Sequence, residues 1–246
     1  MSEKLFFDFH PNKLSILKEN EAHLVSILFE KKIDLTQPFY LEELNEAIRP
    51  FSSSEFDQKF ILFSSNFTLI PSALFLPNEL ENYYSLNFGP LSQNEKLSYD
   101  SLNDLRLCLV YSLPKWLSDF KQKYFFKSEI NHHASLLIKN TINSSQENLI
   151  SIIFEGTSFL MCIKKDNKLL ICNSYEYQSE EDLLYFILAH HKQLELTEDS
   201  FLNLMSYMEE INSEKVLSLI SHFKELNSYT INFIDKTEYN STLRCE

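Results

Sequence analysis

The chain has 246 residues, of which 44% are hydrophobic and 23% are charged, and its formal net charge is −13. This composition is typical of a folded globular protein, and the negative charge argues against nucleic acid or an anionic membrane surface as a partner, because both attract basic surfaces. Glycine occurs only at Gly89 and Gly156. The chain therefore lacks the residues from which glycine-rich phosphate loops are built.

The cysteine pattern and the length of the apolar runs predict a cytoplasmic protein. The four cysteines, Cys108, Cys162, Cys172 and Cys245, are widely spaced and form no Cys-x-x-Cys pair. A signal peptide is not expected, because the polar residues at the start lead at once into a strand-like run. No apolar stretch approaches the ~18 residues of a membrane-spanning helix. We therefore expect reduced thiols and no membrane insertion.

In the first part of the chain, apolar residues predict three strands, a helix and a fourth strand. The strands are expected at residues 5–9, 13–18, 23–29 and 60–63. Leu41, Leu44 and Ile48 share one face of the helix. Pro50 ends this helix because it cannot donate a backbone hydrogen bond.

The region from residue 67 to residue 140 mixes short strands and helices. The expected segments are edge or loop pieces at 67–70 and 73–75 around Pro71, a helix at 77–84, a loop at 89–95, a strand at 105–113 and a helix at 131–140. Pro77 suits the first position of its helix. Trp116, Phe120 and Tyr124 recur at helical spacing and predict one more amphipathic helix.

The stretch from residue 149 to residue 234 has the clearest pattern. Strands are expected at 149–154, 158–163, 169–172, 201–205 and 229–234, with helices at 180–194 and 216–223. Asp166 and Asn167 form a two-residue hairpin signal. Ser179 can cap the helix that follows it, and three acidic residues lie in its first turn.

The order strand-strand-strand-helix-strand-helix-strand is that of a ribonuclease-H-like unit, and the first half begins in the same way. We therefore predict an α/β fold with mixed sheets and two ribonuclease-H-like βββαβαβ lobes. The lobe boundaries are placed at residues 1–124 and 125–246.

Several short motifs strengthen this prediction. They are Ile70-Pro71, Leu74-Phe75, Val110-Tyr111-Ser112-Leu113-Pro114, His133, Asn173-Ser174-Tyr175-Glu176-Tyr177 and Asp182-Leu183-Leu184-Tyr185-Phe186. With these motifs the chain resembles a bacterial family of uncharacterised proteins whose fold is a degenerate form of the actin-like ATPase fold. The resemblance spans most of the chain and implies two lobes around a cleft. It implies no catalytic residues.

Two strand junctions occupy equivalent places in the two halves, and in actin-like ATPases the equivalent hairpins hold nucleotide phosphates. The second junction, Glu155-Gly156-Thr157, keeps the acidic, glycine and hydroxyl residues of that pattern. The first junction has Asp8 but continues with Phe9, His10 and Pro11. Pro11 has no N–H to offer a phosphate. Asp8, His10, Glu155, Gly156 and Thr157 are the candidate residues of the expected interlobe cleft.

A further candidate surface follows the third strand of the second half. Asn173, Tyr175 and Tyr177 stand where ribonuclease-H-like lobes turn toward the cleft, and they could form a recognition surface there. Packed tyrosines with solvated hydroxyls are the simpler interpretation.

Other sites are weakly supported. The pairs His132-His133 and His190-His191 consist of neighbouring residues on expected helices, which point about 100° apart and cannot chelate one metal ion together. The motifs of zinc proteases, serine hydrolases and P-loop proteins are absent. We therefore expect no metal, no cofactor and no assignable catalytic residue.

Three functions remain open. The first is a non-catalytic interaction protein that has lost nucleotide binding and contacts an unidentified protein partner. The alternative is an ATP-binding actin-like ATPase or sugar-kinase-like enzyme that uses Asp8 and Glu155 in the interlobe cleft. A nuclease with clustered carboxylates ranks last, because the negative charge opposes nucleic acid. The oligomeric state is left open.

Overall fold

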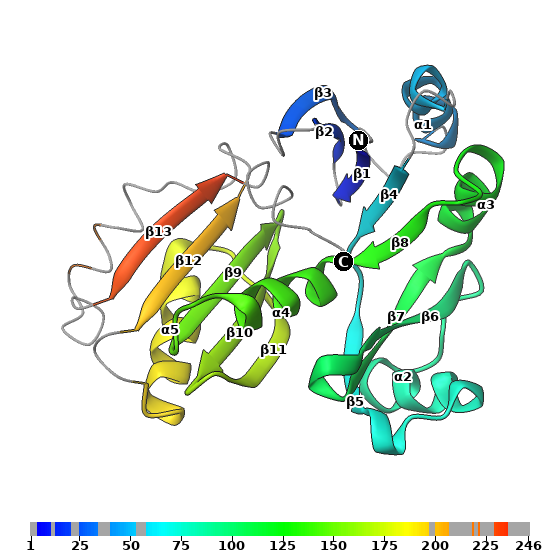
Figure 1. The fold of residues 1–246 in the computed structure, drawn as a ribbon. Coiled ribbons are helices and arrows are strands. Elements are labelled where there is room, and N and C mark those ends of the chain that lie inside the picture. Colours follow the sequence, from blue (N-terminus) through cyan, green and yellow to red (C-terminus); the bar gives the residue numbers. More distant parts are fainter. Residues whose placement is uncertain are drawn as a thin grey trace. The chain divides into compact units, whose positions relative to one another are not determined.

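The computed structural model describes residues 4–10, 13–20, 25–33, 40–52, 58–196, 200–206, 218, 221 and 229–235 (Figure 1). Contacts divide the chain into two units, Met1–Ser135 and Leu136–Glu246. The sequence placed this division at residue 124/125. The first unit extends further because the short strand Glu129–His132 pairs with residues 60–63.

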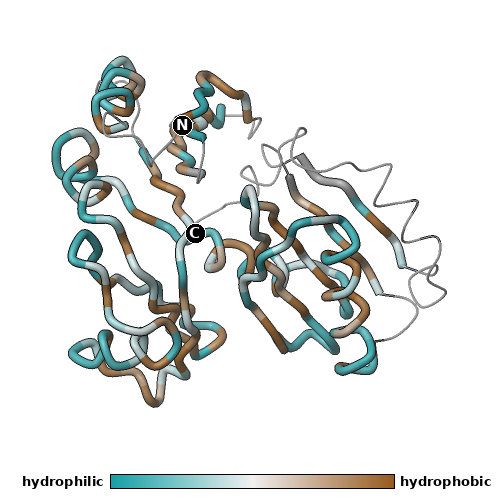
Figure 2. The backbone as a smooth tube through the Cα atoms, turned by 180° about the vertical axis from the view of Figure 1, so that it is seen from behind, coloured by the Kyte–Doolittle hydropathy of each residue, from teal (hydrophilic) through white to brown (hydrophobic). Residues whose placement is uncertain are grey.

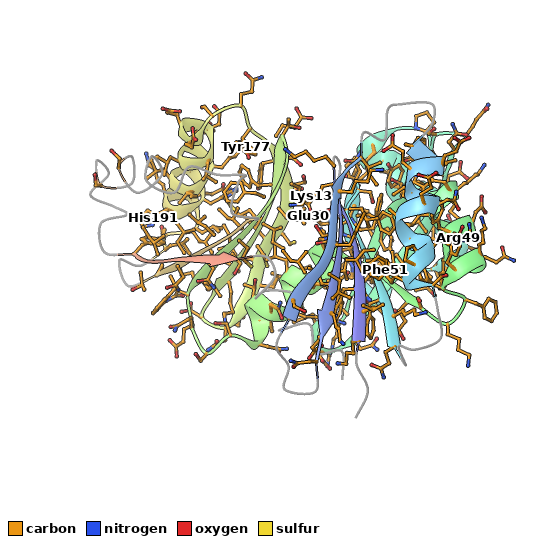
Figure 3. The ribbon with its side chains drawn as sticks, turned by 90° about the horizontal axis from the view of Figure 1, so that it is seen from above. Lys13, Glu30, Arg49, Phe51, Tyr177 and His191 are labelled. Carbon is orange, nitrogen blue, oxygen red and sulfur yellow. The ribbon has the colours of Figure 1, made fainter. Side chains whose placement is uncertain are left out.

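The first unit is built on a five-stranded sheet with the order β3-β2-β1-β4-β8. Its strands are β1 (Lys4–His10), β2 (Lys13–Glu19), β3 (Val25–Lys32), β4 (Gln58–Phe63) and β8 (Glu129–His132). The first three strands are antiparallel, whereas β4 and β8 run parallel to β1. Lys13 of β2 and Glu30 of β3 pair across the sheet (Figure 3). The four expected strands are thus confirmed. Helix α1 (Tyr40–Ile48) is also confirmed, and it ends where Pro50 enters a 3₁₀ turn.

A second, three-stranded sheet is inserted after β4. It consists of β5 (Phe67–Pro71), β6 (Glu95–Leu102) and β7 (Leu107–Pro114) in the order β5-β7-β6, with helix α2 (Leu80–Phe88) between β5 and β6. β5 is an edge strand, as Pro71 at its end predicted. Pro77 opens a short 3₁₀ turn before α2 instead of the helix itself. The sequence prediction missed β6, because its alternating residues are mostly polar.

Two helices follow the inserted sheet. Helix α3 (Lys115–Tyr124) carries Trp116, Phe120 and Tyr124 as predicted. Helix α4 (His133–Asn143) begins two residues later than predicted, because Asn131 and His132 complete β8. The fully buried Lys164 binds carbonyl groups at the end of this helix. Its Nζ donates to Ser144 O at 2.8 Å and to Ile142 O at 3.4 Å.

The second unit repeats the strand order in the sheet β11-β10-β9-β12-β13. Its strands are β9 (Leu149–Glu155), β10 (Ser158–Lys165), β11 (Lys168–Glu176), β12 (Phe201–Ser206) and β13 (Thr230–Asp235), and α5 (Glu180–Gln193) follows β11. All five expected strands are confirmed. The expected helix at 216–223 falls outside the described residues, apart from 218 and 221.

Local signals in the second unit behave as the sequence predicted. Asp166 and Asn167 adopt positive φ angles of 50° and 59°, as a two-residue hairpin requires. Ser179 accepts a hydrogen bond from Asp182 N, and the Asp182 carboxylate accepts from Ser179 N at 3.1 Å. Every residue of β9 is buried, and Figure 2 shows hydrophobic residues gathered along the central strands.

Candidate functional site

Asp8 lies in the middle of the first sheet and is fully enclosed. Its side chain is 0% exposed, and its Oδ1 lies 2.9 Å from Nε2 of His133, which is itself 1% exposed. His133 is the first residue of α4, so the contact joins the central strand to the start of that helix. A charge can be buried in a protein when a partner compensates it. Asp8 is therefore a core residue with its own basic partner.

A second, half-buried acid, Asp100 of β6, connects the inserted sheet to β8 and α4. Its Oδ1 accepts from the Tyr111 hydroxyl at 3.1 Å, and its Oδ2 accepts from Ser135 Oγ at 2.6 Å and from His132 N at 3.2 Å. Burial and the charge of Asp100 raise the pKa of Tyr111 well above its usual range. The hydroxyl of Tyr111 thus stays protonated and donates to Asp100.

The neighbouring residues His132 and His133 contact different groups. The His132 ring accepts from Ala134 N at 3.0 Å and contacts the backbone of Ser65, whereas His133 faces Asp8. Within the part of the chain that the structure describes, no group of three or more His, Cys, Asp or Glu side chains could hold a metal ion.

The cysteines are thiols in strands rather than activated nucleophiles. Cys108 lies in β7, Cys162 in β10 and Cys172 in β11, and all three are free. Cys162 and Cys172 are directly opposite each other. The pKa of the Cys172 thiol is raised above its usual value, mainly by a hydrogen bond with Cys162 and next by burial. Cys245 lies outside the described residues.

The predicted hairpin of the second unit is present. Glu155 ends β9 and is 5% exposed, and Gly156 takes a φ of +69° at the turn. Thr157 O accepts from Tyr177 N at 3.0 Å. In the first unit, the backbone of His10 forms the last pair of the β1–β2 hairpin with Lys13. Asp8 and Glu155 thus occupy equivalent hairpins in separate units.

The tyrosines that follow Cys172 pack within the second unit. The Tyr175 ring lies 4.5 Å from that of Phe186 and 5.5 Å from that of Phe159, and its hydroxyl is 2.8 Å from His190 Nε2. Burial raises the pKa of Tyr175 and lowers that of His190, which favours the neutral form of both groups. The half-buried Tyr177, labelled in Figure 3, packs near Phe159, and Asn173 is exposed.

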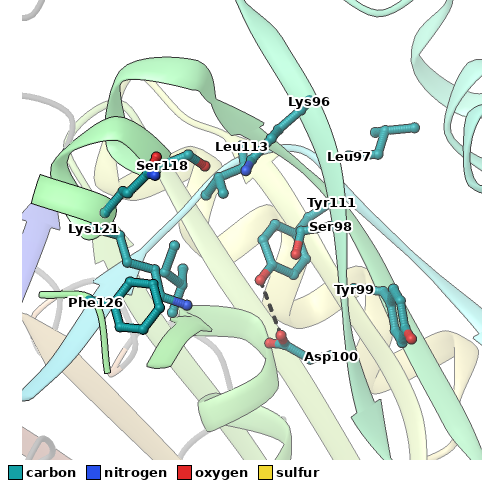
Figure 4. Close-up of a pocket in the computed structure, with 12 residues that line it drawn as sticks. Lys96, Leu97, Ser98, Tyr99, Asp100, Tyr111, Leu113, Ser118, Lys121 and Phe126 are labelled. Carbon is teal, nitrogen blue, oxygen red and sulfur yellow. Dashed lines mark hydrogen bonds between the residues drawn. The ribbon is translucent and has the colours of Figure 1, made fainter. Parts of the chain in front are cut away.

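A pocket of about 370 Å³ lies in the first unit, between the inserted sheet, α3 and β8 (Figure 4). It is lined by Lys96, Leu97, Ser98, Tyr99 and Asp100 of β6, Tyr111 and Leu113 of β7, Ser118, Lys121 and Gln122 of α3, and Phe126 and Ile130. None of these residues was a candidate in the sequence. The alternation of residues 97–101 was a signal for β6, but residues from four separate segments make the pocket.

The pocket combines basic, polar and apolar groups with one acid, Asp100, whose oxygens already accept hydrogen bonds from Tyr111, His132 N and Ser135. Lys96 and Lys121 make no ion pair with any described residue. Ser118 Oγ is buried without a hydrogen-bond partner among the described residues. Phe126 is 79% exposed, which is unusual for a phenylalanine ring. The pocket can therefore receive an acidic group together with an apolar one.

The fold defined by these two sheets is the actin-like ATPase fold. A protein of unknown function from Bacteroides thetaiotaomicron with that fold matches with a TM-score of 0.82 and 19% identity, over 100% of this chain and 96% of the other. The chain belongs to the family described as "Protein of unknown function (DUF3822)", whose profile matches residues 2–230. The family resemblance in the sequence is thereby confirmed.

More distant solved structures also match. A chain of the PilM–PilN type IV pilus biogenesis complex matches with a TM-score of 0.55 and 9% identity, over 98% of this chain and 89% of the other. An exopolyphosphatase from Cytophaga hutchinsonii has a TM-score of 0.45 and 10% identity, over 87% and 73% of the two chains. No curated protein matches the sequence. None of the described helices is both long and apolar enough to cross a membrane.

Proposed function

We propose that this chain is a non-catalytic protein-interaction protein on an actin-like ATPase fold that has lost nucleotide binding. The observation that carries the proposal is the contact between Asp8 and His133. In actin-like ATPases the acidic residue of the first hairpin positions the metal ion or the water. Here the Asp8 carboxylate is 0% exposed and already faces an imidazole at 2.9 Å. A magnesium ion, which keeps several waters, has no access to such a group.

The two hairpins add a second line of support. A nucleotide phosphate is held by backbone N–H groups of tight turns, which glycine provides most readily. The first junction contains Pro11, and no glycine follows Gly156 in the chain. The chain therefore has few of the glycine turns that present backbone N–H groups to a phosphate.

Binding to another protein is supported by the pocket in the first unit. The pocket offers an exposed phenylalanine, a residue type enriched at protein interfaces, and two lysines that make no ion pair with any described residue. A structure with a similar fold is a chain of the PilM–PilN type IV pilus biogenesis complex. We take from this likeness only the idea that the fold can serve to bind a protein.

The competing function is an ATP-binding enzyme that uses the second hairpin. Glu155, Gly156 and Thr157 keep the acidic, positive-φ and hydroxyl residues at that turn. Isothermal titration of the full chain with Mg-ATP separates the two functions. We expect no binding heat at millimolar Mg-ATP. Binding in the micromolar range, lost in the Glu155→Gln variant, would establish the competing function instead.

A further inference from the structure

One edge of the inserted sheet is open beside the pocket. In the order β5-β7-β6, strand β6 pairs with β7 alone among the described residues. Figure 1 shows β6 at the outer side of this sheet. Five consecutive residues of β6, from Lys96 to Asp100, line the pocket. The pocket therefore runs along the strand, next to a row of backbone groups that a further strand could use.

The hydrogen-bond pattern tells which backbone groups point outward. Lys115 N donates to Asn94 O at 2.9 Å, so this pair belongs to the bonded set of the β6–β7 ladder. In an antiparallel ladder, bonded and non-bonded pairs alternate. The residues Lys96, Ser98 and Asp100 thus bond to β7, and the N–H and C=O groups of Leu97 and Tyr99 point away from it.

The other edge of β7 agrees with this assignment. Ser112 N donates to Asn66 O at 3.3 Å, toward the side of β5. The residues of β7 that bond to β5 are therefore even-numbered, and those that bond to β6 are odd-numbered. Leu113, opposite Lys96, bonds to β6. The hydrogen bonds on both edges of β7 therefore agree that the N–H and C=O groups of Leu97 and Tyr99 point outward.

The opposite wall of the pocket supplies the chemistry for side chains. Lys121 projects from α3, and Phe126 follows that helix (Figure 4). Lys96 lies on β6 itself, so each of the two walls contributes one ammonium group. The local positive charge contrasts with the net charge of −13 on the whole chain. An acidic group gains from both lysines, and an apolar side chain gains from Phe126.

We propose that the groove beside β6 binds an extended acidic segment of a partner protein, which adds to the inserted sheet as a fourth strand. The backbone of the segment bonds to Leu97 and Tyr99, one of its carboxylates pairs with Lys96 and Lys121, and an apolar side chain packs against Phe126. This inference names the partner class of the proposed interaction protein and rests on that function.

The edge strand β3 of the five-stranded sheet fits this role less well. Strand β3 exposes Ile27 by 48% and Leu28 by 41%, but it bulges opposite β2. A bulge disturbs the regular ladder that an added strand needs. The β6 edge has both the ladder and the pocket.

The ligand is sought with a phage-displayed library of random twelve-residue peptides, selected on the full chain. The strongest peptides are synthesised, and their affinity is measured by fluorescence polarisation. We expect selected peptides to carry Asp or Glu between apolar residues. Amide hydrogen exchange should slow at least tenfold at Leu97 and Tyr99 when a peptide binds. The amides of Lys96 and Ser98, which already bond to β7, should change little.

Two variants test the contacts separately. Leu97→Pro removes an outward N–H and leaves the bonds to β7 in place, and we expect it to weaken peptide binding at least tenfold. Lys121→Glu should also weaken binding about tenfold, because reversing a charge turns attraction into repulsion. Lys127→Glu changes the net charge equally, outside the pocket, and should alter binding less than twofold. If Leu97→Pro unfolds the protein, Lys121→Glu and the exchange data carry the test.

The inference is overturned if no acidic peptide is selected, or if the selected peptides protect amides elsewhere than in β6. It is also overturned if Leu97 and Tyr99 are already protected in a dimer of the free chain, because a second copy would then occupy the edge. The Mg-ATP titration remains separate. Absence of both ATP and peptide binding would sink this inference and leave the proposed function standing, whereas ATP binding would remove the proposed function itself.

Discussion

The sheet β3-β2-β1-β4-β8 of the first unit and the sheet β11-β10-β9-β12-β13 of the second have the same order and the same strand directions. Their first hairpins both carry a buried acid, Asp8 in one and Glu155 in the other. They differ in what meets the acid and in the connection after the fourth strand. In the first unit His133 faces Asp8, and a three-stranded sheet is inserted after β4.

This difference distinguishes the repeated five-stranded sheets from the features that only the first unit has. The repeated sheets need only strands of the right pattern, and both units supply them. The pocket belongs to the inserted sheet and the helix that follows it, so it has no counterpart in the described part of the second unit. The first unit thus combines a hairpin whose acid, Asp8, faces His133 with the pocket beside the inserted sheet. The polar residues in its core should respond to mutation more strongly than those of the second unit.

The largest effect is expected from His133→Ala. This substitution leaves the buried carboxyl group of Asp8 without the imidazole of His133, and removing one partner of a buried ionisable pair costs up to about 3–5 kcal/mol. Urea denaturation measures the loss. The double variant Asp8→Leu/His133→Leu replaces both ionisable side chains and should recover much of the stability. A loss below about 1 kcal/mol for His133→Ala would mean that the contact contributes little.

A smaller effect is expected from Lys164→Met in the second unit. The substitution removes the donor to Ser144 O and Ile142 O at the end of α4, and unsatisfied buried groups cost about 1–3 kcal/mol. Lys13→Met is the matched control in the first unit, because Lys13 pairs with Glu30 at a partly exposed site. That pair should contribute about 0–1 kcal/mol. Equal losses for both variants would contradict the assigned role of Lys164.

The smallest effect concerns the pH dependence of the second unit. Burial lowers the pKa of His190, so the unfolded chain binds the proton at a higher pH than the folded chain does. Stability should be greatest above the unfolded pKa of about 6.5, fall as the pH drops below it, and level off under the lowered folded pKa. Thermal unfolding of the chain and of His190→Gln measures this. A difference between the two that is independent of pH would contradict the prediction.

Several local features were predictable because neighbouring residues decide them. The positive φ angles of Asp166 and Asn167 and the cap at Ser179 depend on side chains within a few residues. Strands β9 and β10 were visible as continuous apolar runs, as expected for strands buried on both faces.

What the sequence by itself determined is the set of main strands, their hairpins and caps, and through their order the fold. The tertiary structure decided the rest. The four-residue strand β8 forms because it pairs with β4. The polar strand β6 forms because it pairs with β7. The partner of Asp8 comes from a helix far along the chain, and the pocket gathers residues from β6, β7, α3 and β8. Periodicity records how one segment meets its surroundings, whereas a buried charge pair or a pocket depends on which distant segments become neighbours.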